Sequence, residues 1–104
     1  MKLQNLDAAL KAICTDTYEL AAPPGLTRYI VWAQYGSDGV LGDDSTALTI
    51  PRVQIDVVWQ EMTDTLPDDV TEVLESLHLP FEEISRGYDD DFALRRMILQ
   101  LTVI

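Results

Sequence analysis

The chain has 104 residues, of which 47% are hydrophobic and 24% charged, and its 18 acidic and 7 basic residues give a net charge of −11. This length and composition predict a single globular domain over residues 1–104 and argue against a disordered chain. The negative charge argues against nucleic-acid binding, because such binding depends on lysine and arginine side chains that displace counterions from phosphates.

The sequence also lacks the marks of a membrane or exported protein. No apolar stretch approaches the roughly 20 residues that a membrane span needs. Near the N-terminus, Asn5 and Asp7 interrupt the hydrophobic run of a signal peptide. The only cysteine, Cys14, cannot form an intrachain disulfide or a multi-cysteine metal cluster. We therefore expect a protein that spans no membrane and stays in a reducing compartment.

The first predicted element is a helix over residues 3–17. Its apolar residues recur at three- and four-residue spacing, which places them on one stripe. These residues are Leu3, Leu6, Leu10, Ile13 and Cys14. A proline- and glycine-containing connector at 21–25 follows, and a strand is predicted at 27–35. Large apolar side chains alternate on both sides of that strand, so we expect it to be central and covered on both faces.

Residues 36–46 are rich in glycine and aspartate, which predicts an exposed loop between two antiparallel strands. The second of these strands, at 47–60, alternates apolar and polar residues as a half-buried strand does. Its inward-facing residues are Val53, Ile55, Val57 and Trp59. Pro51 indicates an edge or a bulge early in this strand, because proline cannot donate to a ladder.

A second helix is predicted over residues 67–78, with Pro67 in its first turn and Pro80 after its end. Two strands follow, at 81–87 and 92–103, joined by an aspartate-rich turn. In the last strand, one face carries Met97, Leu99, Leu101 and Val103. The order α-β-β-α-β-β predicts an α+β two-layer sandwich, with a mainly antiparallel four-stranded sheet and two helices on one face.

The residues that could carry chemistry favour structural roles. Cys14 falls on the apolar stripe of the first helix, which favours a core thiol over a nucleophile. His78, the only histidine, follows the second helix and has no cysteine or second histidine with which to bind a metal. The run from Asp89 to Asp91 lacks the spacing of a calcium loop, so it indicates a solvated turn, with weak cation binding as the alternative. The sequence therefore predicts no enzyme, no cofactor and no metal site.

Aromatic residues are the candidates for contact with other subunits. Most of them are expected in the core, but aromatics are also enriched at protein interfaces. Trp32 and Tyr35 belong to a strand whose two faces a domain this small has little material to cover. We therefore single out Trp32 and Tyr35 as candidate subunit-interface residues.

Several segments together resemble a known family. They are the aromatic strand at 29–35 with its glycine–aspartate loop, the alternating strand at 53–59, the helix end at 77–81, and the turn at 88–92 that leads into a hydrophobic strand. In this order they resemble the tail terminator, or tail completion, proteins of long-tailed bacteriophages and prophages. The resemblance covers nearly the whole chain and rests on element order rather than on an invariant motif.

The resemblance implies a virion structural protein of the tail or neck, assembled in the host cytoplasm. Such a protein forms a homo-oligomeric ring, commonly a hexamer, which caps the tail tube protein and joins it to the head–tail connector protein. DNA passes through the ring without specific binding, and the negative charge agrees with that passage. The resemblance also makes the loop at 36–46 a candidate partner contact, through Ser37, Asp38, Asp43 and Asp44.

Three alternatives remain open at the level of sequence. The chain could be another small neck or tail component, since it is compact. It could be an acidic DNA mimic that inhibits a nucleic-acid enzyme, which needs carboxylates spaced like phosphates along one face. It could also be a small ligand-binding α+β domain, which a deep apolar pocket with converging polar groups would favour.

Overall fold

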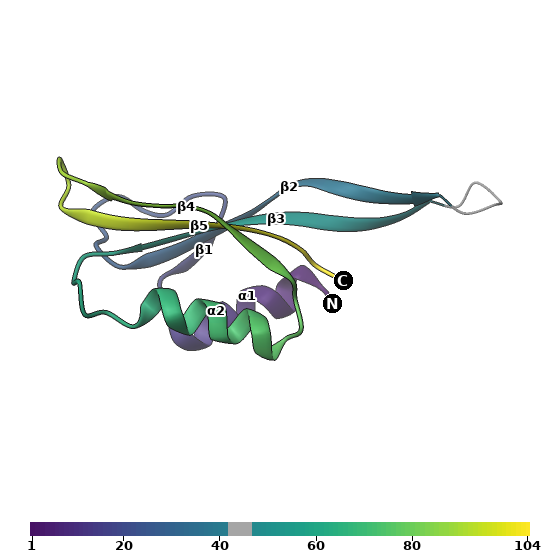
Figure 1. Cartoon of the computed structure of the whole chain (residues 1–104), viewed down its shortest axis with the longest axis horizontal. Coiled ribbons are helices and arrows are strands. Elements are labelled where there is room, and N and C mark those ends of the chain that lie inside the picture. Colours follow the sequence, from purple (N-terminus) through teal and green to yellow (C-terminus); the bar gives the residue numbers. More distant parts are fainter. Residues whose placement is uncertain (42–46) are drawn as a thin grey trace.

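The structure is a computed structural model that describes residues 1–41 and 47–104. Its elements are α1 (Leu3–Ile13), β1 (Thr17–Glu19), β2 (Tyr29–Leu41), β3 (Ala47–Trp59), α2 (Leu66–Ser76), β4 (Phe81–Asp89) and β5 (Leu94–Thr102). The strands form one sheet in the order β1-β2-β3-β5-β4, and both helices cover the same face of it (Figure 1). The predicted α+β class and the two helices on one face are confirmed.

The sheet has one strand more than the sequence predicts, and it is mixed rather than purely antiparallel. The additional strand, β1, pairs in parallel with β2, whereas the other neighbours are antiparallel. The first helix was expected to run to residue 17, but it ends at Ile13 because Cys14 adopts an extended conformation. Thr17 follows in β1, where its hydroxyl donates a 2.7 Å hydrogen bond to the Cys14 carbonyl. Threonine and aspartate are weak helix formers, so this pairing outweighs one more helical turn.

Most of the remaining boundaries agree with the prediction within two or three residues. The main difference lies at 36–46, where the sequence predicts a loop. β2 instead continues through Leu41 and pairs with β3 as far as Ala47, after a bulge between Gln34 and Gly36. The two strands therefore extend the sheet into a two-stranded hairpin.

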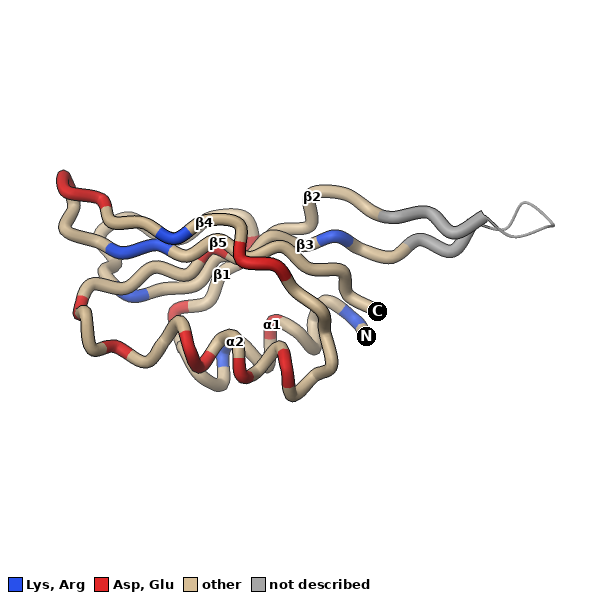
Figure 2. The backbone as a smooth tube through the Cα atoms, viewed as in Figure 1, with Lys and Arg blue, Asp and Glu red and all other residues tan. Residues whose placement is uncertain are grey.

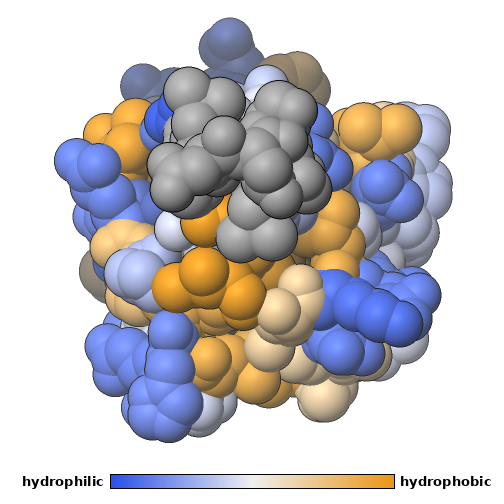
Figure 3. Space-filling view, turned by 90° about the vertical axis from the view of Figure 1, so that its right-hand side faces the viewer, coloured by the Kyte–Doolittle hydropathy of each residue, from blue (hydrophilic) through white to orange (hydrophobic). Residues whose placement is uncertain are grey.

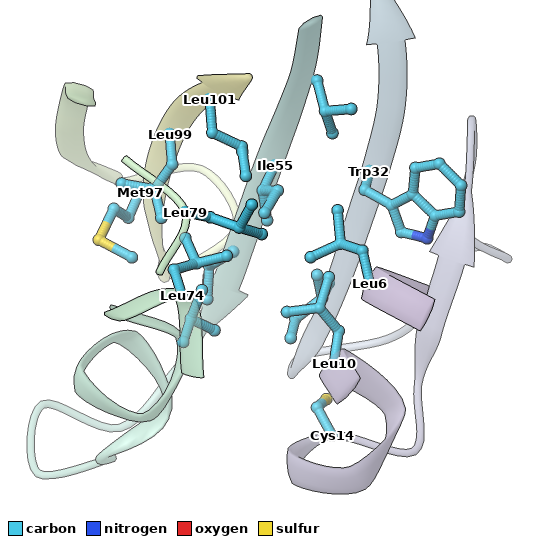
Figure 4. Packing of buried hydrophobic residues seen from close by; sticks show 14 of the residues in the cluster. Leu6, Leu10, Cys14, Trp32, Ile55, Leu74, Leu79, Met97, Leu99 and Leu101 are labelled. Carbon is cyan, nitrogen blue, oxygen red and sulfur yellow. The ribbon is translucent and has the colours of Figure 1, made fainter. Parts of the chain in front are cut away.

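The hydrophobic core lies between the helices and one face of the sheet. The predicted inward-facing residues of β3 and β5 are all buried, and Cys14 joins the same cluster, as predicted. Figure 4 shows Leu6 of α1 beside Trp32, with Leu10 one turn further along the helix, and Leu74 of α2 beside Leu79 and Met97. The expectation that the aromatic strand is covered by packed elements on both faces is wrong in part. Ile30 and Trp32 are buried, but Val31 on the opposite face is half-exposed.

The end of α2 holds a strained residue. His78 has a positive φ of 56°, and the amide of the next residue, Leu79, donates a 3.0 Å hydrogen bond back to the Leu74 carbonyl. This is the arrangement in which helices usually end on glycine, because a left-handed conformation costs other residues about 1–2 kcal/mol.

We expect His78→Gly to raise the free energy of unfolding by about 0.5–1 kcal/mol, since it removes this strain at a small entropic cost. Urea unfolding followed by circular dichroism measures the change. Glu72→Gly, at an exposed position inside α2, is the matched control and should lower stability. A loss of stability in His78→Gly would show that the imidazole itself stabilises the helix end.

Candidate assembly surfaces

The first surface is a projecting hairpin, here called the arm, which comprises residues 36–41 of β2 and 47–51 of β3. Within it the two strands pair only with each other, from Ser37 opposite Pro51 to Leu41 opposite Ala47. β1 flanks β2 only at residues 30–32, and β5 flanks β3 only from Arg52 onward. Figure 1 shows the arm extending away from the two-layer body. Over residues 37–41 and 47–50 of the arm, both outer edges therefore present backbone groups that no other strand of the described chain pairs.

The predicted partner-contact residues fall on this arm or beyond it. Ser37 is exposed on β2, and Asp38 lies in β2 opposite Ile50. Asp43 and Asp44 lie outside the described residues. The arm thus starts at the place where the sequence predicts a contact loop, although its described backbone is strand.

The two predicted interface aromatics have different surroundings. Trp32 belongs to the core of its own chain, with 4% of its surface exposed, and its indole Nε1 donates a 2.8 Å hydrogen bond to Asp7. Tyr35 lies at the base of the arm, 44% exposed, with the Arg52 guanidinium 5.0 Å from its ring centre. Of the pair, only Tyr35 offers a partner a large apolar surface.

The second surface is a groove of about 950 Å³ on the sheet face opposite the helices. One wall is the connector at 20–26, the other is the turn between β4 and β5, and the floor is formed by β2, β3 and β5. The apolar lining residues are Leu20, Pro23, Pro24, Leu26, Tyr29, Val31, Val58, Tyr88 and Phe92. Leu20 and Phe92 are more than two-thirds exposed, so large apolar side chains stand open to solvent on both walls. Exposed apolar groups gathered in this way mark interaction sites.

Charge is distributed unevenly around the groove. Asp89, Asp90 and Asp91 lie at its turn wall, and Arg96 and Asp56 also line it. Figure 2 shows the acidic turn at one end of the molecule, with basic residues along the neighbouring parts of β4 and β5. The Arg95 guanidinium lies 5.2 Å from the ring centre of Tyr88, which orients that aromatic side chain. The mouth of the groove is therefore apolar with an acidic rim.

An ion pair joins the residue that precedes β2 to the start of α2. Arg28 Nε and Nη2 donate hydrogen bonds of 2.8 and 3.3 Å to the two carboxylate oxygens of Asp64, which precedes α2. The Asp64 carboxylate also accepts a 2.9 Å hydrogen bond from the Leu66 amide at the start of α2. The hydrogen bonds that the Arg28 guanidinium and the Leu66 amide donate to Asp64 hold the pKa of this carboxyl below its usual value of 3.8. One carboxylate thus joins Arg28, just before β2, to the first turn of α2.

We expect Asp64→Asn to lower the free energy of unfolding by about 1 kcal/mol at pH 7, allowing for the exposure of Arg28. A carboxylate whose pKa is lowered in the folded state adds stability above its unfolded pKa and loses it as pH falls through the folded value. The difference between wild type and variant should therefore close as pH falls from about 5 to below 3.8. Urea titrations across this range measure it, with Asp90→Asn on the exposed turn as the matched control. A difference that is unchanged at low pH would contradict this assignment.

The third surface, here called the terminal patch, comprises Met1, Leu3, Phe81 and Ile104. Met1 and Ile104 are exposed, and Leu3 and Phe81 are partly buried against the core. The Met1 ammonium donates a 2.7 Å hydrogen bond to the Ile104 carbonyl, and Phe81 pairs with Leu101 of β5. Figure 3 shows an apolar area beneath the arm, on the end of the molecule that carries the termini.

The candidate chemical residues do not converge on a reactive site. Burial raises the pKa of the Cys14 thiol, which keeps it protonated in the core. His78 is exposed at the end of α2. Among the described residues, no group of three or more histidine, cysteine, aspartate or glutamate side chains is arranged to hold a metal ion. In the same part of the chain, neither helix is long and apolar enough to cross a bilayer.

The sequence singled out the segment at 36–46 and Tyr35 as candidate contacts, and these stay predictions; it did not indicate the groove or the terminal patch. The groove brings together residues 20–26 and 88–92, which are far apart in the sequence and adjacent only because β2, β3 and β5 pair between them. The only sequence signal for the groove is that Leu20 and Phe92 are large apolar residues next to predicted turns. A single apolar residue of this kind does not predict a binding site.

Comparison with known proteins identifies a shared fold. No protein-family model matches the chain, and no curated protein matches it. Among solved structures, it is similar to a chain from the virion of a native gene transfer agent (GTA) particle. The two chains align with a TM-score of 0.51 and 17% identity, over 95% of this chain and 87% of the other. At that identity the likeness establishes the fold.

Proposed function

We propose that the chain is a non-enzymatic structural protein of a phage or phage-like virion. It forms a ring that caps the tail tube and joins the tail to the head connector, with DNA passing through the opening. The observation that carries this proposal is the fold shared, over nearly its whole length, with a chain of a gene transfer agent virion. The sequence resemblance to tail terminator proteins points to the same class independently.

The shape of the molecule supports assembly with other subunits. The molecule measures 52 × 25 × 22 Å, and the arm projects from its body (Figure 1). An isolated two-stranded ribbon is only marginally stable in water. Its unpaired edges are suited to pairing with a neighbouring subunit or a tail protein. We therefore assign the arm, with Ser37 and Asp38, to contacts between proteins.

The electrostatics support passage of DNA rather than its capture. The chain carries a net charge of −11, and two of its arginines pair with carboxylates in the described structure. A ring of such subunits carries a large negative charge, which repels the phosphate backbone at short range. DNA can then move through the opening without being held there.

Size-exclusion chromatography coupled to light scattering tests the proposal, at several protein concentrations and with and without magnesium. The expected result is a mass that rises with concentration toward a closed ring, a hexamer by the family resemblance. A strict monomer under every condition, and also in the presence of tail tubes, would contradict it. That result would favour the ligand-binding or DNA-mimic alternatives instead.

A further inference from the structure

One margin of the sheet is open along the β2 side of the arm. The Pro51 carbonyl accepts a hydrogen bond from the Val103 amide, so the backbone groups of Pro51 point away from β2. Ser37 lies opposite Pro51, and opposed residues of an antiparallel pair point either both toward each other or both away. The N–H and C=O groups of Ser37, Gly39 and Leu41 therefore point to the outer edge of β2. No other strand of the described chain pairs with them there.

The β3 side of the arm is less open. Pro51 has no amide hydrogen to donate, and its carbonyl already accepts the hydrogen bond from Val103. A proline on an edge strand hinders the addition of a further strand. The β2 side has no proline over residues 37–41. Of the two edges of the arm, that of β2 is therefore the better acceptor for another strand.

The opposite margin of the sheet is β4, which within the described chain pairs only with β5. All residues of β4 except the first are exposed. A bulge between Glu83 and Ser85 interrupts the strand, whereas residues 85–89 pair regularly with β5. The β5 partners of Arg86 and Tyr88 point to β3, so the backbone groups of Arg86 and Tyr88 point away from the sheet. Residues 85–89 thus form a second open edge.

We propose that residues 37–41 of one subunit add as a strand to residues 85–89 of β4 in a second copy of this chain. The two stretches are equally long, and both present unpaired backbone groups. They lie at opposite margins of one sheet, so each contact continues the sheet from subunit to subunit. Such a contact is heterologous, and it forms a ring when the rotation closes. This inference rests on the proposed ring and specifies its subunit interface.

The occupant of each edge follows from the need to pair both of them. Two arms, or two β4 strands, joined about a twofold axis close after two subunits and leave the other edge of each subunit open. A strand from a different protein would also pair only one edge. Open strand edges invite further association, and the pairing of unlike edges in a closed ring is the arrangement that removes both.

Proline substitutions in the full chain test this contact, because proline removes the amide hydrogen and places its ring on the strand edge. Ser37→Pro alters the arm and Tyr88→Pro alters β4, in both cases at an amide that points away from the neighbouring strand of its own chain. Ser37→Ala and Tyr88→Ala are the matched controls, since they shorten the side chain and keep the amide. Circular dichroism confirms folding, and native mass spectrometry measures the assembled species.

Each proline variant should need at least about thirtyfold more protein for half-assembly than its alanine control, the loss typical of a disrupted interface centre. An equimolar mixture of the two proline variants should form a one-to-one heterodimer and nothing larger, because each such pair retains a single intact contact. Hydrogen exchange of the wild-type chain adds a measurement that needs no variant. The amides of residues 37–41 and 85–89 should exchange more slowly in the assembled chain than in the monomer.

The other outcomes separate the interface from the function. If wild type forms a ring and the proline variants assemble like their alanine controls, the ring stands and the proposed interface is wrong. The same holds if the proline variants form rings but no longer bind tail tubes, since the arm would then pair with a tail protein. Unchanged exchange at both edges on assembly, or a mixture that stays monomeric, would show that the two edges do not pair. A wild-type chain that remains monomeric throughout contradicts both proposals.

Discussion

Replacing Leu10 with alanine is expected to lower the free energy of unfolding by about 3 kcal/mol. Leu10 is fully buried, and with Leu6 it is one of only two fully buried residues of α1. Removing three carbon atoms there leaves a cavity between α1 and the sheet (Figure 4). In urea, the unfolding midpoint should fall while the slope of the transition stays constant.

Leu20→Ala is the matched control, because it makes the same chemical change at a side chain that is 73% exposed. It should alter stability by less than about 0.5 kcal/mol. Equal losses in the two variants would contradict the packing of α1 against the sheet. A small loss in Leu10→Ala alone would mean that α1 adds little to the core.

Shortening the arm is expected to abolish assembly while leaving the body folded. In this variant, a two-residue Asn-Gly turn replaces residues 38–50. Ser37 then still pairs with Pro51, and the Pro51 carbonyl still accepts the 2.9 Å hydrogen bond from the Val103 amide. The removed strand residues pair only with each other, so the unfolding midpoint should change little. Binding to tail tubes should fall at least about a hundredfold, a loss typical of a deleted interface centre.

The control for this variant keeps the length of the arm and changes one contact residue. Ser37→Ala removes only a hydroxyl at an exposed site and should change binding by less than about threefold. An arm-shortened protein that still binds tail tubes like wild type would show that the arm is not a contact surface. A shortened protein that fails to fold would show that the arm stabilises the body.

The elements that the sequence predicts well are those with a strong local pattern. Val53, Ile55 and Val57 alternate with polar residues, and burial of one sheet face imposes this period of two. α2 was predicted because Pro67, its first-turn acids and its apolar stripe agree with one another. In both cases the information lies within a dozen consecutive residues.

Other features depend on tertiary pairing and could not be predicted from local patterns. β1 has three residues, too few to show a period, and it exists because Thr17–Glu19 pairs with β2. The glycine–aspartate composition of 36–46 favours a loop, yet pairing across the hairpin keeps residues up to Leu41 in a strand. Trp32 was expected at an interface because nothing in the sequence shows that α1 folds back over it.

The proposed ring role is tested most directly by electron microscopy of the purified chain incubated with tail tubes, which are taken from virions of the kind to which the proposal assigns it. We expect a single ring-shaped density at one end of each tube, with an opening on its axis. The arm-shortened variant should leave the tube ends bare. Binding along the sides of the tubes, or the absence of any binding by a folded wild-type chain, would contradict a role as the ring that completes the tail.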